Sequence, residues 1–261
     1  MKFFLTCCSL LIIASCYKVE EKASSASISA PQYFLWGGSF PKNVYYSTSV
    51  VTQYQTDTEA MITQWNEVFK EPQKTFFQSN TTQPTSQSFS DQFSGISSIN
   101  DGFNTVYLVD DEFWPTQSAT ALGVAILLGR MNKYDQYIIE EVDILIKTNR
   151  PQYDAQTIIL HELGHFLGLQ HLDLGYSRKS ETVMYPAIAE GEEKHTPTEI
   201  DVNNLAKLYG IPSPYSAKIP RKREIAPGQG QLKRMMIELN ADMNCRHILE
   251  GVEVHSHQVK L

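Results

Sequence analysis

Three of the seven histidines in this 261-residue chain lie within one short stretch, His161-Glu-Leu-Gly-His-Phe-Leu-Gly-Leu-Gln-His171. On a helix, His161 and His165 are offset by about 40° around the axis and about 6 Å along it, so both imidazoles lie on one face and can bind one metal ion. Glu162 is rotated by about 100° from His161, which places its carboxylate beside the pair. There it can reach a water molecule and is not a natural third ligand.

His171 can join the other two histidines only if the chain turns back. A continued helix would carry it about 600° around the axis and about 9 Å beyond His165. Gly168 supplies the turn, because glycine adopts a left-handed conformation at a helix end without steric cost. The pattern therefore predicts a zinc ion held by all three histidines with one position open to water, and Glu162 as the general base and acid of metal-assisted hydrolysis, most simply of a peptide bond.

The alternative is a buried hydrogen-bond network or a chance cluster of histidines. Five fixed positions in eleven residues, on a stretch that also fits a capped amphipathic helix, make this alternative the weaker one.

Capping signals and apolar spacing predict the helices that position these residues. Asp154 can cap the helix that carries the histidines. An earlier helix is expected after a capping box formed by Thr56 and Glu59. A last helix is expected after a capping box that begins at Thr196, and this helix is expected to end at Gly210. Apolar residues of the histidine helix are expected to face a sheet; they are Ile158, Ile159, Leu163, Phe166 and Leu167.

Four stretches rich in β-branched and aromatic residues predict strands at residues 43–49, 105–109, 122–128 and 137–147. The order of strand, helix, several strands and then helices indicates an α+β fold in which a mixed sheet packs on helices.

The histidine stretch resembles the HExxHxxGxxH signature of the metzincin zinc peptidases. Thr182-Val-Met-Tyr-Pro186 is similar to their Met-turn, and the Met-Tyr-Pro form together with Leu205–Gly210 resembles the matrixins, the clan of matrix metalloproteases. The resemblance implies a metzincin-like zincin fold for residues 32–210, with a mixed twisted sheet, an active-site helix, a Met-turn and a C-terminal helix. It also implies that Met184 forms an apolar floor beneath the zinc.

The same resemblance implies how a substrate binds. The strand at 122–128 is expected to be an edge strand on which an extended protein or peptide substrate is laid by strand addition. The loop 187–197 is expected to form one wall of the main specificity pocket. No cysteine lies between Cys16 and Cys245, so the cysteine-switch propeptide of animal matrixins is missing, and any latency needs another device. Calcium has no identifiable site, although the turns Asp101-Gly102 and Asp110-Asp111 are candidates.

The N-terminus fits an export signal over residues 1–15. Ile13-Ala-Ser-Cys16 resembles the lipobox of bacterial lipoproteins, in which the cysteine is acylated, and residues 16–31 are predicted to be a flexible linker. The sequence thus predicts an exported protein that is anchored by lipid in the bacterial cell envelope, at an outer membrane or the cell surface. An ordinary signal peptide that happens to carry cysteines is the alternative.

Charge is unevenly distributed along the chain. Residues 211–261 hold eight Lys+Arg and five Asp+Glu, a net charge of +3. Since the whole chain has a net charge of −7, the first 210 residues have a net charge of −10. An acidic body argues against nucleic acid as a partner. We expect a monomer, with residues 211–261 as a solvated tail or a small docking element of unknown role. A second metal site using Cys245, His247, His255 and His257 is a weaker alternative.

These observations predict a zinc-dependent endopeptidase. Two alternatives use the same residues: a zinc hydrolase of a non-peptide amide or ester, and a catalytically silent surface lipoprotein that binds a partner on a peptidase scaffold. The intact Glu162 argues against the second of these alternatives, because loss of the glutamate or of a ligand is its expected mark.

Overall fold

The computed structural model describes residues 31–47, 50, 52–69, 75–79, 100–114, 119–172, 174–218, 220–241, 244–250 and 252–258. The predicted signal, Cys16 and all but residue 31 of the predicted linker lie outside these ranges. Within them, no helix has the length and apolar character needed to cross a membrane.

The strands that the structure describes form one mixed sheet. Its order is β3-β2-β4-β6-β5-β7-β8-β9, and β1 pairs with β6 beside this path. The pairs among β1, β2, β3, β4 and β6 are parallel, whereas β5, β7, β8 and β9 join by antiparallel pairing. The strands are β1 (Tyr33–Trp36), β2 (Lys42–Tyr46), β3 (Phe77–Ser79), β4 (Thr105–Val109), β5 (Ala121–Met131), β6 (Gln136–Lys147), β7 (Lys233–Asn240), β8 (Asn244–Leu249) and β9 (Val252–Gln258). This architecture confirms the predicted α+β class.

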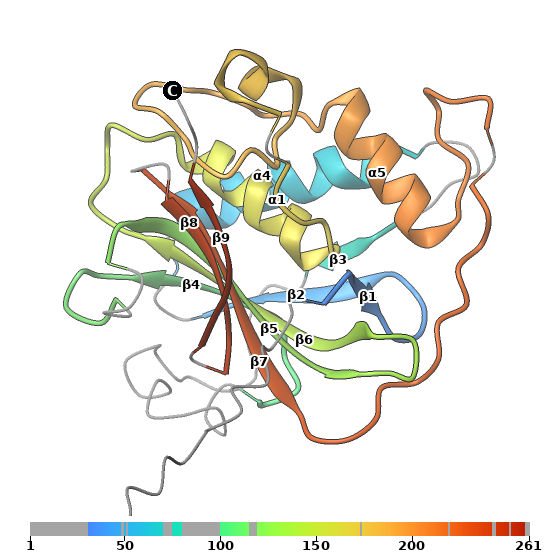
Figure 1. The fold of residues 1–261 in the computed structure, drawn as a ribbon. Coiled ribbons are helices and arrows are strands. Elements are labelled where there is room, and N and C mark those ends of the chain that lie inside the picture. Colours follow the sequence, from blue (N-terminus) through green and yellow to red (C-terminus); the bar gives the residue numbers. More distant parts are fainter. Residues whose placement is uncertain are drawn as a thin grey trace, which may run out of the picture.

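Three α-helices lie over one face of the sheet (Figure 1): α1 (Thr52–Glu67), α4 (Ala155–Phe166) and α5 (Glu199–Tyr209). A short 3-10 helix, η2 (Tyr176–Glu181), lies between α4 and α5 in the chain. The main apolar core fills the space between helices and sheet, and Trp65 joins the helices α1 and α4 because its indole N–H donates to the Leu160 carbonyl at 3.0 Å.

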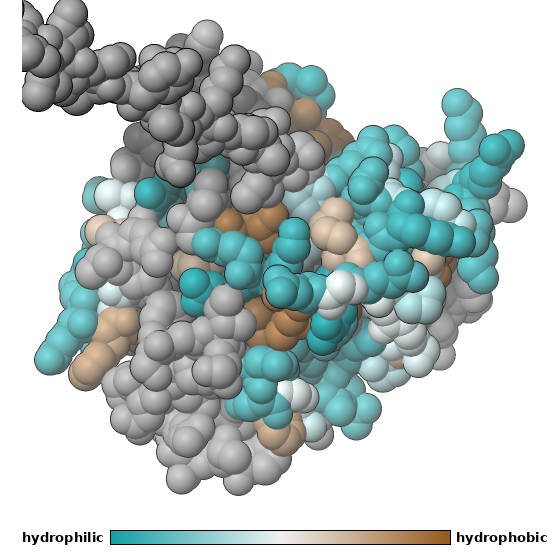
Figure 2. All heavy atoms as spheres, turned by 60° about the horizontal axis from the view of Figure 1, so that its bottom comes forward, coloured by the Kyte–Doolittle hydropathy of each residue, from teal (hydrophilic) through white to brown (hydrophobic). Residues whose placement is uncertain are grey.

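A smaller apolar cluster lies on the other face of the sheet. It includes Tyr107, Val124, Ile126 and Leu145. Figure 2 views the molecule from that side, and hydrophobic surface appears there in limited areas between polar side chains. The face that carries the helices therefore holds most of the buried apolar residues and positions the histidine helix.

Two predicted capping boxes are displaced in the structure. The helix α1 begins at Thr52, and the Thr56 hydroxyl donates to the Thr52 carbonyl at 2.9 Å inside the helix, so Thr56 is not a cap. The cap of α5 is Thr198 and not Thr196, with Asp201 as its reciprocal partner. Both errors arise because Ser, Thr and acidic residues recur every few positions, so several boxes fit the local pattern. The end of α5 at Gly210, with φ of 64°, is as predicted.

Two further predictions about the sheet are wrong. The strand predicted at the edge, now β5, is an interior strand that pairs with β6 on one side and β7 on the other. Residues 233–258 are not a solvated tail: they form β7, β8 and β9 and extend the sheet, which fits the other predicted option, a small docking element. Pairing between strands about 100 residues apart leaves no local signal in the sequence.

Strand β6 buries two acidic residues on the side of β4. Glu141 is 4% exposed and accepts hydrogen bonds from the backbone N–H groups of Asp101 and Gly102, and Asp143 accepts one from Thr105. Burial raises the pKa of Glu141 to about 7, and the nearby Asp101 carboxylate adds to the rise. Burial likewise raises the pKa of Asp143 well above its usual range.

A folded pKa above the unfolded value means that the folded protein holds the Glu141 proton more tightly. The free energy of unfolding should therefore fall as pH rises from about 4.5 towards about 7, by on the order of 3 kcal/mol for this group. We expect Glu141→Gln to flatten this part of the profile in urea unfolding, while the exposed neighbour variant Glu140→Gln leaves it unchanged. Equal slopes in all three proteins would contradict the assignment.

Candidate active site

The histidine helix α4 begins where the sequence predicts. Asp154 is its N-cap, and its carboxylate accepts the Thr157 backbone N–H at 2.7 Å. At the other end, the Trp36 indole N–H donates to the Phe166 carbonyl at 2.6 Å and the Tyr209 hydroxyl donates to the Leu167 carbonyl at 2.8 Å. Side chains from β1 and α5 thus satisfy the last carbonyls of α4 and hold it in place.

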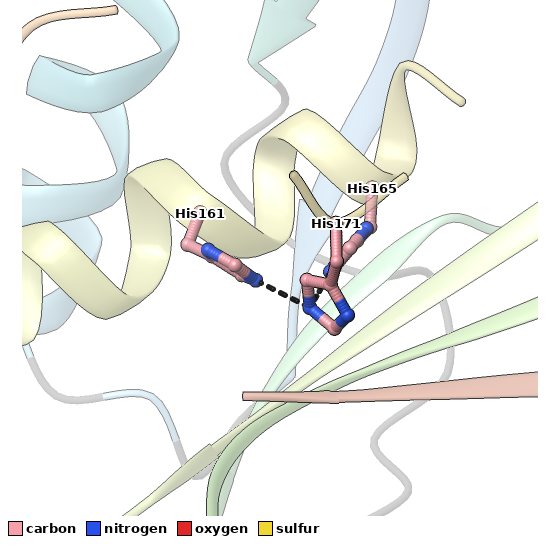
Figure 3. Close-up of side chains that lie close together, drawn as sticks. All are labelled: His161, His165 and His171. Carbon is pink, nitrogen blue, oxygen red and sulfur yellow. Dashed lines mark hydrogen bonds between the residues drawn. The ribbon is translucent and has the colours of Figure 1, made fainter. Parts of the chain in front are cut away.

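Gly168 makes the predicted turn. Its φ is 88°, and a Cβ at this position would lie 2.2 Å from the Phe34 carbonyl oxygen, so both the backbone conformation and the space require glycine. The chain reverses here and brings His171 back to the helix. The Nε2 atom of His171 lies 3.1 Å from that of His161 and 3.0 Å from that of His165. Figure 3 shows the three rings converging from α4 and from the segment that follows it.

Backbone carbonyls fix the orientation of two of these rings. Nδ1 of His161 donates to the Val183 carbonyl at 2.7 Å, and Nδ1 of His165 donates to the Leu169 carbonyl at 2.8 Å. Each ring therefore carries its proton on Nδ1, and each Nε2 points its lone pair at the common centre. Burial also lowers the pKa of His161 to about 3, with the Lys194 charge contributing, so this imidazole is neutral at physiological pH.

This set of donor atoms fits a zinc ion. Neutral imidazole nitrogens are preferred zinc ligands, and two of them on a tetrahedral zinc lie about 3.3 Å apart, close to the spacings observed between these Nε2 atoms. Among the described residues, His161, His165 and His171 form the one group of three or more His, Cys, Asp or Glu side chains gathered closely enough to hold a metal. The predicted ligand histidines are thus brought together.

Glu162 lies beside the histidines with its carboxylate directed at β5. It is fully buried, neither carboxylate oxygen has a hydrogen-bond partner, and a Cβ at Gly123 would lie 2.4 Å from Oε1. Burial raises the pKa of Glu162 well above its usual range, and the Glu238 carboxylate adds to this. A buried carboxyl group without partners is costly unless a polar ligand meets it, which is what a proton-accepting residue beside a metal requires.

Met184 lies against α4 at Gly164, the residue next to His165. A Cβ at Gly164 would come within 2.3 Å of the Met184 sulfur, so the thioether packs directly on the helix between the turns that carry His161 and His165. The Met184 carbonyl also accepts the Leu172 backbone N–H at 2.8 Å, next to His171. This position agrees with an apolar floor beneath the metal.

Asp201 was not among the predicted site residues. This residue is fully buried, and its carboxylate accepts the Thr182 hydroxyl and the Val183 backbone N–H at the start of the turn that ends in Met184. Because the Val183 carbonyl holds His161, Asp201 positions a ligand from the first turn of α5. The spacing Thr198-x-x-Asp201 is the signal that could have located it.

His247, named in the alternative second metal site, lies instead against the histidine cluster. Its Nε2 lies 3.1 Å from Nδ1 of His171, so strand β8 contacts the third histidine. The side chains of Cys245, His255 and His257, named in the alternative second metal site, lie outside what the structure describes.

The calcium candidates serve other purposes. Asp101 and Gly102 form a turn whose N–H groups bind Glu141, and Asp111 forms ion pairs with Lys147 at 3.2 Å and with Arg150 at 2.7 Å. No calcium site is identified among the described residues.

Comparisons with known proteins agree with this geometry. The matrixin family model matches residues 47–210, more than half of the chain. Metalloendoproteinase 1 of Glycine max is 31% identical over 77 residues, which are 30% of this chain and 24% of that protein. Metalloendoproteinase 2-MMP of Arabidopsis thaliana is 40% identical over 57 residues, 22% of this chain and 14% of that protein. The chain therefore matches about a quarter or less of the length of these relatives.

Proposed function

The chain belongs to the matrixin family of metzincin peptidases, and from this premise we propose that it is a zinc-dependent endopeptidase whose substrates are proteins or peptides. The observation that carries the proposal is the convergence of His161, His165 and His171 beside a fully buried Glu162. A bound zinc would supply the Lewis acidity that activates water for attack on a carbonyl carbon.

The residues of the chain have separate roles in this proposal. The three histidines would hold the metal through Nε2, and the Val183 and Leu169 carbonyls would keep two of the rings in the ligating tautomer. Glu162 would accept the proton of the attacking water and pass it to the leaving amine. Met184 would support the site from below.

An endopeptidase is favoured over a hydrolase of small amides or esters by what the chain resembles, because the matrixin family model spans the histidine site. The printed names of the relatives, metalloendoproteinases, support the same choice.

We also propose export and lipid anchoring at Cys16. Support comes from the apolar run from Phe3 to Ala14 and the Ile13-Ala-Ser-Cys16 motif. Anchoring would hold the peptidase at an outer membrane or cell surface, where it would meet extracellular or envelope proteins.

The zinc assignment predicts a sharp difference between two histidine variants. After dialysis, we expect about one zinc per unmodified chain and far less in His165→Ala, because a buried ligand is removed. His195→Ala is the matched control, since His195 is a partly exposed histidine outside the cluster. Metal content is measured by mass spectrometry, together with slow cleavage of unfolded casein. Equal zinc in all three proteins would argue against the proposal.

A further inference from the structure

Strand β7 occupies the edge of β5 where a substrate strand would be added. Residues Lys233–Asn240 pair antiparallel with β5, with Ile237 opposite Ala125 and Leu239 opposite Gly123. Since β6 takes the other edge of β5, no edge of this strand is left for a second peptide. Gly123 is also the residue against which the Glu162 carboxylate lies, so β7 passes directly beside the catalytic residues.

The end of β7 is held from the opposite side as well. Asn240 forms a parallel bridge with Ala187, and its carbonyl accepts the Ile188 backbone N–H at 3.3 Å. Ala187 and Ile188 belong to the loop predicted to form the wall of the specificity pocket. The end of β7 therefore lies between β5 and the loop 187–197, the two segments that are expected to bind an extended substrate.

Leu239 lies near the end of β7, between β5 and the loop 187–197. It is 1% exposed and lines a cavity with His161, Val183, Tyr185 and Ile188 among others. The space that remains is about 10 Å³, no more than one water molecule needs. A leucine side chain of the chain itself thus occupies the pocket next to a predicted zinc ligand.

Strand β8 fastens β7 in this position. Arg246 donates from Nε to the fully buried Glu238 carboxylate at 3.0 Å, which ties the two strands by an ion pair. His247 lies within hydrogen-bond distance of His171. In the folded chain the exposed fractions of His161, Glu162, His165 and His171 are only 1%, 0%, 0% and 7%.

We propose that residues 233–258 are an inhibitory segment that keeps the peptidase latent by binding in its own substrate cleft; this inference rests on the proposed function. The segment is joined to the body by residues 211–232, which contain no helix or strand in their described part, so it can leave the cleft without unfolding of α5. Latency in this chain is then achieved by a C-terminal strand, and a substrate must displace it.

Full-length Leu239→Asp tests the proposal by placing a charge in the apolar pocket. We expect casein cleavage to rise by about tenfold or more, and Leu239→Ala, which keeps an apolar residue, to give a smaller rise. Ile225→Asp is the matched control, because Ile225 is an exposed aliphatic residue of the connecting segment, and its rate should equal that of the unmodified chain.

The rate of histidine modification by diethyl pyrocarbonate is a second measurement, which needs neither metal nor catalysis. In metal-free unmodified chain, the peptide with His161, His165 and His171 should react at least about tenfold more slowly than the partly exposed His195. Leu239→Asp should remove most of this protection, and Leu239→Ala part of it.

Casein cleavage and histidine modification together distinguish failure of the proposed peptidase function from failure of the proposed inhibitory segment. Protection that is lost in Leu239→Asp without casein cleavage by any protein would refute the peptidase and leave occlusion standing. Cleavage and histidine reactivity that are equal in the unmodified chain, Leu239→Ala and Leu239→Asp would overturn the inhibitory segment. Circular dichroism shows whether each variant is folded. If Leu239→Asp is not folded, casein cleavage and histidine reactivity of Leu239→Ala test the inhibitory segment.

Discussion

Glu162→Gln is expected to lower the rate of peptide-bond cleavage by about a thousandfold while the protein keeps its zinc. Glutamine has almost the same shape as glutamate, so the packing against Gly123 and the neighbouring helix turn is preserved. It cannot accept the proton of the attacking water, and that transfer is the role assigned to this side chain. The histidines are untouched, so metal content should stay at about one zinc per chain.

The rate is best compared in the Leu239→Asp chain, in which the cleft is expected to be open. Glu193→Gln is the matched control, because it makes the same chemical change at an exposed position in the loop after Met184. We expect it to cleave casein at the parent rate. A Glu162→Gln protein that kept more than about a tenth of the rate would show that another group takes the proton.

The parts of the site that could be predicted from the sequence depend on neighbours in the chain. The cap at Asp154, the shared face of His161 and His165, and the left-handed turn at Gly168 all follow from helix geometry. The structure confirms each of them, and it brings His171 back to the other two histidines as expected. Short-range rules suffice here because the whole ligand set spans eleven residues.

The parts that were missed depend on pairing across the fold. The strand pattern of β5 shows that it is buried but not which strand lies beside it, so the edge assignment was wrong. Residues 211–261 look polar and mixed in charge, and their alternation of apolar residues in Met235, Ile237 and Leu239 becomes meaningful only when β5 is opposite. Burial of Glu141 and Asp143 in β6 was likewise not visible, because their backbone partners come from a turn and from the start of β4, about 40 residues away.

Asp201→Ala is expected to destabilise the protein and to weaken zinc binding together. The carboxylate accepts hydrogen bonds from the Val183 N–H at 2.9 Å, from the Thr198 N–H at 2.9 Å and from the Thr182 hydroxyl. Alanine leaves these donors, two of them buried, without partners, at roughly 1–3 kcal/mol for each buried one, so we expect the free energy of unfolding to fall by about 4 kcal/mol.

The effect on zinc follows from the chain of contacts between α5 and the metal ligand. Val183, whose N–H is held by Asp201, holds Nδ1 of His161 through its carbonyl. Loosening this link should lower zinc affinity by about tenfold or more, as loss of a partner behind a ligand does. Unfolding in urea and zinc competition with a chelator measure the two effects.

Glu199→Ala is the matched control for Asp201→Ala. It removes an exposed carboxylate from the same first turn of α5. The free energy of unfolding should therefore change by less than about 0.5 kcal/mol, and zinc affinity should not change. If Asp201→Ala lowered stability but left zinc affinity at the value of the control, Asp201 would be a structural cap of α5 alone. A coupled loss of both would show that the first turn of α5 positions His161, which links the C-terminal helix of the fold to the metal.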